Sequence, residues 1–108
     1  MSQISTHVLD TALGRPAAGV SVVLKNVDGE LLGDGFTDAD GRVANLGPDI
    51  LPPGSYQLVF MTGPYFEAAS QPVFFPQITI DFQVTDPTEH LHVPLLLSPF
   101  AYSTYRGS

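Results

Sequence analysis

The stretch Ile78-Thr79-Ile80-Asp81-Phe82-Gln83-Val84-Thr85 alternates apolar and polar side chains without interruption. Successive side chains of a β-strand point to opposite faces, so a period of two predicts a strand with one buried and one solvated face. This is the cleanest alternation in the chain, and shorter versions of it occur on both sides. The fold is therefore expected to be built mainly from strands.

Turn-forming residues divide the rest of the chain into similar short segments. Ten glycines and ten prolines do this, and Asp28-Gly29 is a strong hairpin signal. Besides 78–85, strands are expected over residues 3–9, 19–27, 30–37, 42–46, 55–62, 90–97 and 101–106. The one helix-compatible stretch, Tyr65–Ala69, lies between two prolines and allows about two turns. Eight short strands and one helix predict a single all-β domain over residues 1–108, either a sandwich or a small barrel.

The composition excludes several classes of protein. Eleven acidic residues against four basic ones give a net charge of -7, which repels phosphate backbones and anionic bilayers, so neither nucleic acid nor a membrane is an expected partner. The chain has no cysteine and therefore no disulfide, thiolate metal site or cysteine nucleophile. No apolar run approaches the roughly 20 residues of a transmembrane helix, and Met1–Ser5 lacks the features of a secretory signal. A soluble cytoplasmic protein is expected.

The three histidines are the first candidates for chemistry, because imidazole titrates near neutral pH. His7 shares a strand face with Ser5 and points away from the presumed core, and His90 and His92 lie two apart on one face. Such positions are most often simply exposed to solvent. A three-histidine zinc site is the alternative, but the pattern is common in strands, and we expect no metal and no cofactor. Motifs such as Gly-x-Ser-x-Gly or His-Glu-x-x-His do not occur.

A turn and the C-terminus carry two of the four basic residues. Asp38-Ala39-Asp40-Gly41 predicts a tight turn directly before Arg42, and the later acidic ligands of a calcium loop are missing. The final stretch, Tyr102–Ser108, contains two tyrosines and Arg106 directly after an apolar strand. Most termini fray, whereas this one has the composition of an ordered segment with a function.

These residues together resemble the transthyretin-like proteins. Ser5-Thr6-His7-Val8-Leu9-Asp10, followed by Gly14-Arg15-Pro16-Ala17, is similar to the opening of that family, and His90-Leu91-His92-Val93-Pro94-Leu95-Leu96-Leu97-Ser98-Pro99 is similar to its penultimate strand. The terminal Tyr105-Arg106-Gly107-Ser108 is the signature of one branch, the 5-hydroxyisourate hydrolases of purine degradation. The resemblance covers essentially the whole chain.

The resemblance implies a fold, an assembly and a reaction. The fold would be a Greek-key β-sandwich of two four-stranded sheets with one short helix. The assembly would be a homotetramer that pairs edge strands across two-fold axes and carries its sites at subunit interfaces. The reaction would be hydrolysis of the small molecule 5-hydroxyisourate to 2-oxo-4-hydroxy-4-carboxy-5-ureidoimidazoline. Leu91 and Ala101 depart from the residues that the family commonly has, and we expect them to alter packing more than chemistry.

The same resemblance implies which residues act. The catalytic set would be His7, Arg42 and His92, with substrate contacts from His7, Arg42, Tyr105, Arg106 and Ser108. In this hypothesis His92 deprotonates water, His7 shares the proton network and Arg42 binds ring oxygens and stabilises the developing charge. Which histidine is the base stays open.

Other functions remain as alternatives. A transthyretin-type carrier would bind a small aromatic ligand in the central channel without turning it over. A zinc enzyme would lose activity on chelation. A β-sandwich adhesion or assembly module would leave the polar C-terminus and the outward histidines unexplained.

Overall fold

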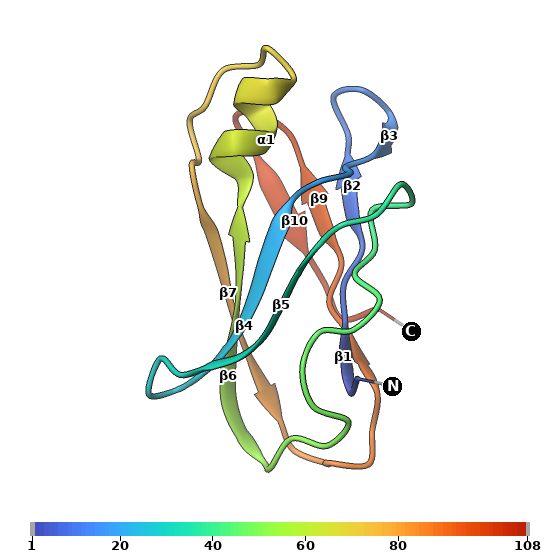
Figure 1. Ribbon diagram of the computed structural model, residues 1–108, viewed down its shortest axis with the longest axis vertical. Coiled ribbons are helices and arrows are strands. Elements are labelled where there is room, and N and C mark those ends of the chain that lie inside the picture. The colour runs from blue at the N-terminus through green and yellow to red at the C-terminus, as the bar shows by residue number, and fades with distance from the viewer. Residues whose placement is uncertain (1, 108) are drawn as a thin grey trace.

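The computed structural model describes residues 2–107 and forms them into short strands and one helix (Figure 1). In chain order the elements are β1 (Ile4–Ser5), β2 (Val8–Asp10), β3 (Arg15–Pro16), β4 (Ser21–Asn26), β5 (Leu31–Phe36), β6 (Gly54–Met61), α1 (Thr62–Ala68), β7 (Ile78–Val84), β8 (Leu91–His92), β9 (Leu95–Leu97) and β10 (Tyr102–Thr104). The alternating stretch that predicts the fold is β7. Across residues 2–107, no helix has the length and apolarity that crossing a bilayer requires.

The strands form two four-stranded sheets packed face to face (Figure 1). One sheet has the order β5-β4-β6-β7 with antiparallel neighbours, and the other has the order β10-β9-β2-β3 with β2 and β9 parallel. The pair β1-β8 is parallel too and keeps the register of β2-β9, so it prolongs the second sheet. The predicted sandwich of two four-stranded sheets with one short helix is confirmed, and the first strands of the chain lie beside the last ones.

The long parallel ladder is interrupted without losing its hydrogen bonds. Three amides on one side donate to three carbonyls on the other, each at 2.9 Å: Leu91 to Gln3, Val93 to Ser5 and Leu95 to His7. Pro94 has no N–H to contribute, and Thr6 Oγ1 donates to the Val93 carbonyl at 2.6 Å. The backbone therefore stays paired along the whole run, and side chains on it keep fixed relative positions.

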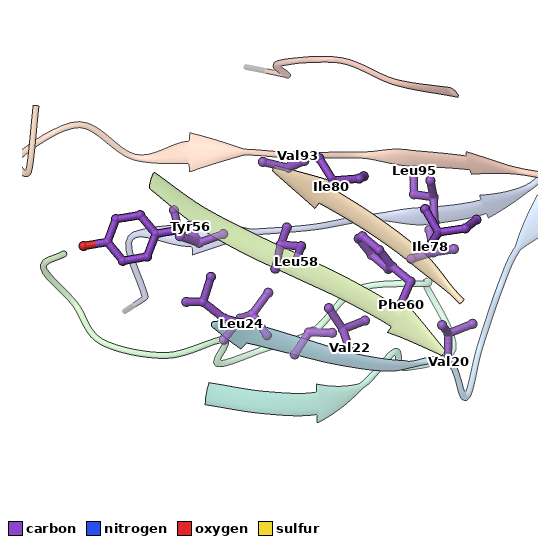
Figure 2. Close-up of a cluster of buried hydrophobic side chains, with 14 of the residues drawn as sticks. Val20, Val22, Leu24, Tyr56, Leu58, Phe60, Ile78, Ile80, Val93 and Leu95 are labelled. Atoms are coloured by element: carbon purple, nitrogen blue, oxygen red, sulfur yellow. The ribbon is translucent and has the colours of Figure 1, made fainter. Parts of the chain in front are cut away.

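The core fills the space between the two sheets (Figure 2). Alternate side chains of the first sheet point inward and meet those of the second: Val22 and Leu24 of β4, Leu58 and Phe60 of β6, and Ile78 and Ile80 of β7 face Val93 and Leu95. The polar partners of this alternation, such as Thr79 and Asp81, are exposed. Burial of apolar area, at roughly 25 cal/mol per Å², is what holds the two layers together.

The predicted hairpin at Asp28-Gly29 is confirmed between β4 and β5. Asn26 Oδ1 accepts from the amides of Asp28 and Glu30 at 3.0 and 2.9 Å, and Gly29 has a φ of 82°. Only glycine adopts such a left-handed backbone without steric cost.

The predicted strand over residues 42–46 is wrong. Arg42 forms one isolated bridge with His7, and the chain then continues as irregular structure. Side chains of the N-terminal segment take up amides of this loop: Leu46 N donates to Ser2 Oγ at 2.8 Å, and Leu51 N donates to Gln3 Oε1 at 2.6 Å. These bonds to side chains replace the backbone hydrogen bonds that a strand would form with a neighbouring strand.

Other boundaries also differ from the prediction. The strands expected over residues 3–9 and 90–97 are each divided in two, into β1 and β2 and into β8 and β9. Arg15 and Pro16, expected in a turn, form the edge strand β3, where a proline is tolerated because its nitrogen faces away from the sheet. Helix α1 begins at Thr62, three residues before the expected start, and packs the buried Phe66 against the core.

Candidate active site

Backbone pairing places His7 and His92 on neighbouring strands of the second sheet. Ser5 of β1 is paired directly with His92 of β8, and His7 follows two residues later on the same face. The two histidines are therefore diagonal neighbours, although 85 positions separate 7 from 92 in the chain. Both side chains are half-buried.

A compact turn brings Arg42 to the same place. Asp38 Oδ1 accepts from the amides of Asp40 and Arg42 at 2.9 and 3.0 Å, and these bonds lower the pKa of Asp38 below its usual range. The carbonyl of Gly41 accepts from Val8 N at 2.8 Å, which attaches the turn to β2. The turn predicted from the sequence thus presents the exposed Arg42 beside His7.

Glycine is required at the end of this turn. Gly41 has a φ of 78°, and a Cβ added there would lie 2.4 Å from the Val8 carbonyl oxygen and 3.3 Å from His7 Cδ2. Any larger residue would separate the turn from β2. The spacing between His7 and Arg42 therefore depends on Gly41.

The hydrogen bond of His7 fixes the position of its proton. His7 Nε2 lies 2.7 Å from the carbonyl oxygen of Asp40. A carbonyl oxygen only accepts hydrogen bonds, so Nε2 carries the proton and donates it. In the neutral ring Nδ1 is then the unprotonated nitrogen.

His92 is held in a different way. Its Nδ1 lies 2.8 Å from Ser5 Oγ, and the same hydroxyl lies 2.8 Å from His90 Nε2. Since Nδ1 is engaged with Ser5, Nε2 is the nitrogen that can meet water or a substrate. His90, just ahead of β8, and His92 share one face as predicted, and one serine hydroxyl lies within hydrogen-bond distance of both.

The surroundings of His92 favour its neutral form. Burial lowers the pKa of His92 below the usual value of 6.5, and the positive charges of Arg42, His7 and His90 lower it further. An imidazole that is neutral at pH 7 can accept a proton. The cluster therefore combines a potential base with a guanidinium that can bind an anion.

The C-terminal segment contacts His92. Gly107 forms an isolated bridge with His92 and donates its N–H to the His92 carbonyl at 2.8 Å. A Cβ on Gly107 would lie 2.6 Å from His92 Cδ2. The backbone of the segment thus packs against the imidazole ring itself.

The structure does not bring all the predicted substrate contacts together. Tyr105 and Arg106 line a cavity of about 260 Å³ between β7 and the C-terminal segment, and neither His7 nor His92 lines it. Arg106 forms an ion pair with Glu89. Ser108, the remaining predicted contact, lies outside the described residues.

The sequence interpretation missed the role of Ser5. Its signal was present, because Ser5 shares the strand face of His7 and a serine hydroxyl beside an imidazole can orient it. The three-histidine zinc alternative has no support in the geometry: residues 2–107 contain no group of three or more His, Asp or Glu side chains placed to hold a metal ion.

Comparison with known proteins gives consistent matches along the chain. The profile of the HIUase/Transthyretin family matches residues 4–107. The 5-hydroxyisourate hydrolase of Caulobacter vibrioides is 47% identical over 115 residues and covers 100% of both chains. That of Salmonella typhimurium is 48% identical over 109 residues, covering 97% of this chain and 80% of its own.

Solved structures match the fold as well. The 5-hydroxyisourate hydrolase of Klebsiella pneumoniae has a TM-score of 0.88 at 43% identity and covers 97% of this chain and 98% of its own. Sea bream transthyretin in complex with thyroxine has a TM-score of 0.90 at 29% identity, covering 97% and 94%. The backbone is thus similar to both proteins, and the sequence is more similar to the hydrolases.

Proposed function

The chain belongs to the HIUase/Transthyretin family, and from that premise we propose that it hydrolyses 5-hydroxyisourate to 2-oxo-4-hydroxy-4-carboxy-5-ureidoimidazoline in urate degradation. The observation that carries the proposal is the gathering of His7, Arg42 and His92 at one place by three separate segments of the chain. Relatives named 5-hydroxyisourate hydrolase at 47 and 48% identity support this substrate.

The proposed reaction uses water and opens the ring at a cyclic amide. His92 Nε2 takes a proton from water while the water oxygen adds to the amide carbonyl. Arg42 binds the carbonyl oxygen and stabilises its negative charge in the transition state. The C–N bond then breaks, and the proton held by His92 passes to the leaving nitrogen, which leaves a carboxylic acid and a neutral imidazole.

We assign the role of base to His92 because its surroundings keep the ring neutral and its Nε2 is free to meet water. His7 Nε2 already donates its proton to the Asp40 carbonyl, so His7 is held as a donor on that side. His92 has its lowered pKa and an Nε2 that Ser5 does not occupy. His7 then serves to orient the proton network.

We further propose that one domain, residues 1–108, carries this activity in the cytoplasm as part of a homotetramer with sites at subunit interfaces. Exposed aromatic side chains near the edge strand β10 support an assembly surface. Phe74 and Phe100 are 63 and 65% exposed, and their ring centroids lie 6.0 Å apart. The ring centroids of Phe75 and Tyr102 lie 5.1 Å apart. Apolar surface of this kind is typical of subunit contacts.

The remaining predicted residues would contact the substrate from the C-terminal segment. Tyr105, Arg106 and Ser108 would complete the substrate site from the C-terminal segment, and the bridge between Gly107 and His92 supports this position. The alternative function, a carrier of a small aromatic ligand, is not favoured, because the chain is 29% identical to thyroxine-bound transthyretin and 43 to 48% identical to relatives named 5-hydroxyisourate hydrolase.

A coupled assay tests the proposal. Urate oxidase generates 5-hydroxyisourate, and its ultraviolet decay is followed with and without this protein. We expect the wild type to accelerate the decay, Arg42→Gln to lose at least tenfold in kcat/KM, and Arg15→Gln, a matched change of an exposed arginine on β3, to retain it. A folded wild-type protein that binds the substrate without accelerating its decay would overturn the hydrolase and favour the carrier.

A further inference from the structure

One hydroxyl joins two imidazoles in this protein. Ser5 Oγ lies 2.8 Å from His92 Nδ1 on one side and 2.8 Å from His90 Nε2 on the other. A serine hydroxyl has one proton and two acceptor lone pairs, so it donates to at most one of the two rings. When the Ser5 proton is used within this group, the three side chains form a directed chain of hydrogen bonds with two possible directions.

The two directions give His92 opposite properties. When His92 Nδ1–H donates to Ser5 and Ser5 donates to His90, the Nε2 of His92 is bare and can act as a base. When His90 Nε2–H donates to Ser5 and Ser5 donates to His92 Nδ1, the proton of neutral His92 is on Nε2 and the ring cannot take a proton there.

We propose that Ser5 and His90 are positioning residues that set which nitrogen of His92 carries the proton. The inference rests on the proposed function, in which His92 Nε2 is the base. It assigns the active direction to His92 Nδ1–H donating toward Ser5 and on to a neutral His90. Neither positioning residue needs to contact the substrate.

The exposure of His90 makes it the end of the chain that solvent can control. His90 is exposed, whereas Ser5 and His92 are half-buried. A protonated His90 has only donors, so its Nε2–H donates to Ser5. The Ser5 proton then has His92 Nδ1 as its one acceptor in the group, which favours the reversed direction. The charged or titratable groups that act on His92 are Arg42 from the loop after β5, His7 ahead of β2, and His90 ahead of β8.

Substitution of His90 by residues with only one hydrogen-bonding sense tests the direction. His90→Glu offers an acceptor only and favours the active direction, while His90→Lys offers a donor only and favours the reversed one. At pH 8, where His92 is neutral in both variants, we expect His90→Glu to keep kcat within threefold and His90→Lys to lose at least tenfold, with KM little changed. Equal activity of the two variants, or a loss confined to His90→Glu, would overturn the proposal.

Ser5 gives a second test through the hydroxyl itself. Ser5→Ala removes it and should lower kcat at least tenfold, and Ser5→Thr should restore activity because it keeps the hydroxyl. Ser55→Ala, on an exposed position of β6, is the matched control and should behave as the wild type. Wild-type kcat in Ser5→Ala would contradict a positioning role.

A spectroscopic measurement reads the tautomer without any substrate. With three histidines in the chain, ¹⁵N-labelled imidazoles can be assigned by single variants. At pH 8 we expect His92 with a protonated Nδ1 and a bare Nε2 in the wild type and in His90→Glu, and the reverse in His90→Lys. A wild-type His92 with its proton on Nε2 refutes the inference. If the tautomers follow the prediction and 5-hydroxyisourate is not hydrolysed, the proposed function fails and the hydrogen-bond chain stands.

Discussion

Replacement of Gly107 by alanine should reduce catalysis while leaving the fold intact. The added Cβ would lie 2.6 Å from His92 Cδ2 and 3.2 Å from Pro94 Cγ. Carbon atoms in favourable contact are about 3.5–4.0 Å apart, so the imidazole and the C-terminal segment must separate by about 1 Å. A misplacement of that size costs about 100-fold in rate, which equals roughly 2.7 kcal/mol in activation free energy.

The matched control is Gly29→Ala in the β4–β5 hairpin. A Cβ at Gly29 meets no atom within 4 Å, but its φ of 82° is left-handed, which costs an alanine roughly 1–2 kcal/mol. A loss of about 1 kcal/mol lowers Tm by about 4 °C or more in a domain of this size. The two variants should therefore differ in opposite ways. Gly107→Ala should have a lower kcat and an unchanged Tm, and Gly29→Ala should have a lower Tm and an unchanged kcat.

Stopped-flow decay of 5-hydroxyisourate and thermal unfolding by circular dichroism measure these two quantities on the same preparations. This prediction is contradicted if a folded Gly107→Ala variant retains kcat within twofold of the wild type. It is also refuted if Gly29→Ala loses as much activity as Gly107→Ala, since the loss would then reflect stability alone.

Three other outcomes follow from buried or charged groups. Burial and the 2.6 Å hydrogen bond to Asp10 raise the pKa of Tyr65 to about 12. The stability that this interaction contributes is complete below pH 10 and is lost as pH rises toward 12. Absorbance titration should show this ionisation as an alkaline phase, and Tyr65→Phe should abolish it. Arg42→Gln removes a positive charge that lowers the pKa of His92, so NMR titration should show a higher pKa for His92 in the variant. As pH falls, the variant then loses its neutral imidazole at a higher pH than the wild type does. Phe60 is fully buried, and Phe60→Ala should cost about 3–5 kcal/mol in urea unfolding.

The strands of the first sheet were predictable because their signal is local. Successive residues of β7 alternate between core and solvent, and Asp28-Gly29 has the chemistry of a hairpin turn. The segment after Arg42 misled the prediction because its apolar residues suggested a strand. Its amides instead bond to side chains more than 40 positions away, such as Ser2 and Gln3, which no window along the sequence can reveal.

The candidate site divides in the same way. The residue types and the turn before Arg42 could be predicted, and the shared face of His90 and His92 follows from a period of two. The contact of Ser5 with both rings could not be predicted from spacing, because it depends on the parallel register of β1 and β8. Family resemblance supplied the selection of His7, Arg42 and His92 that local pattern alone left open.

The parallel pairing of β1 and β2 with β8 and β9 also determines when the site can exist during synthesis. A ribosome adds about 5–20 residues per second, so Ser5 and His7 emerge seconds before His92 is made. Until then the opening strands lack one partner, and the loop that must close to pair Ser5 with His92 spans 87 positions, a slow, non-local step. A nascent chain thus carries Ser5 and His7 before the strands that bring His92 beside them exist, and the proposed site can assemble only after β8 and β9 have been synthesised.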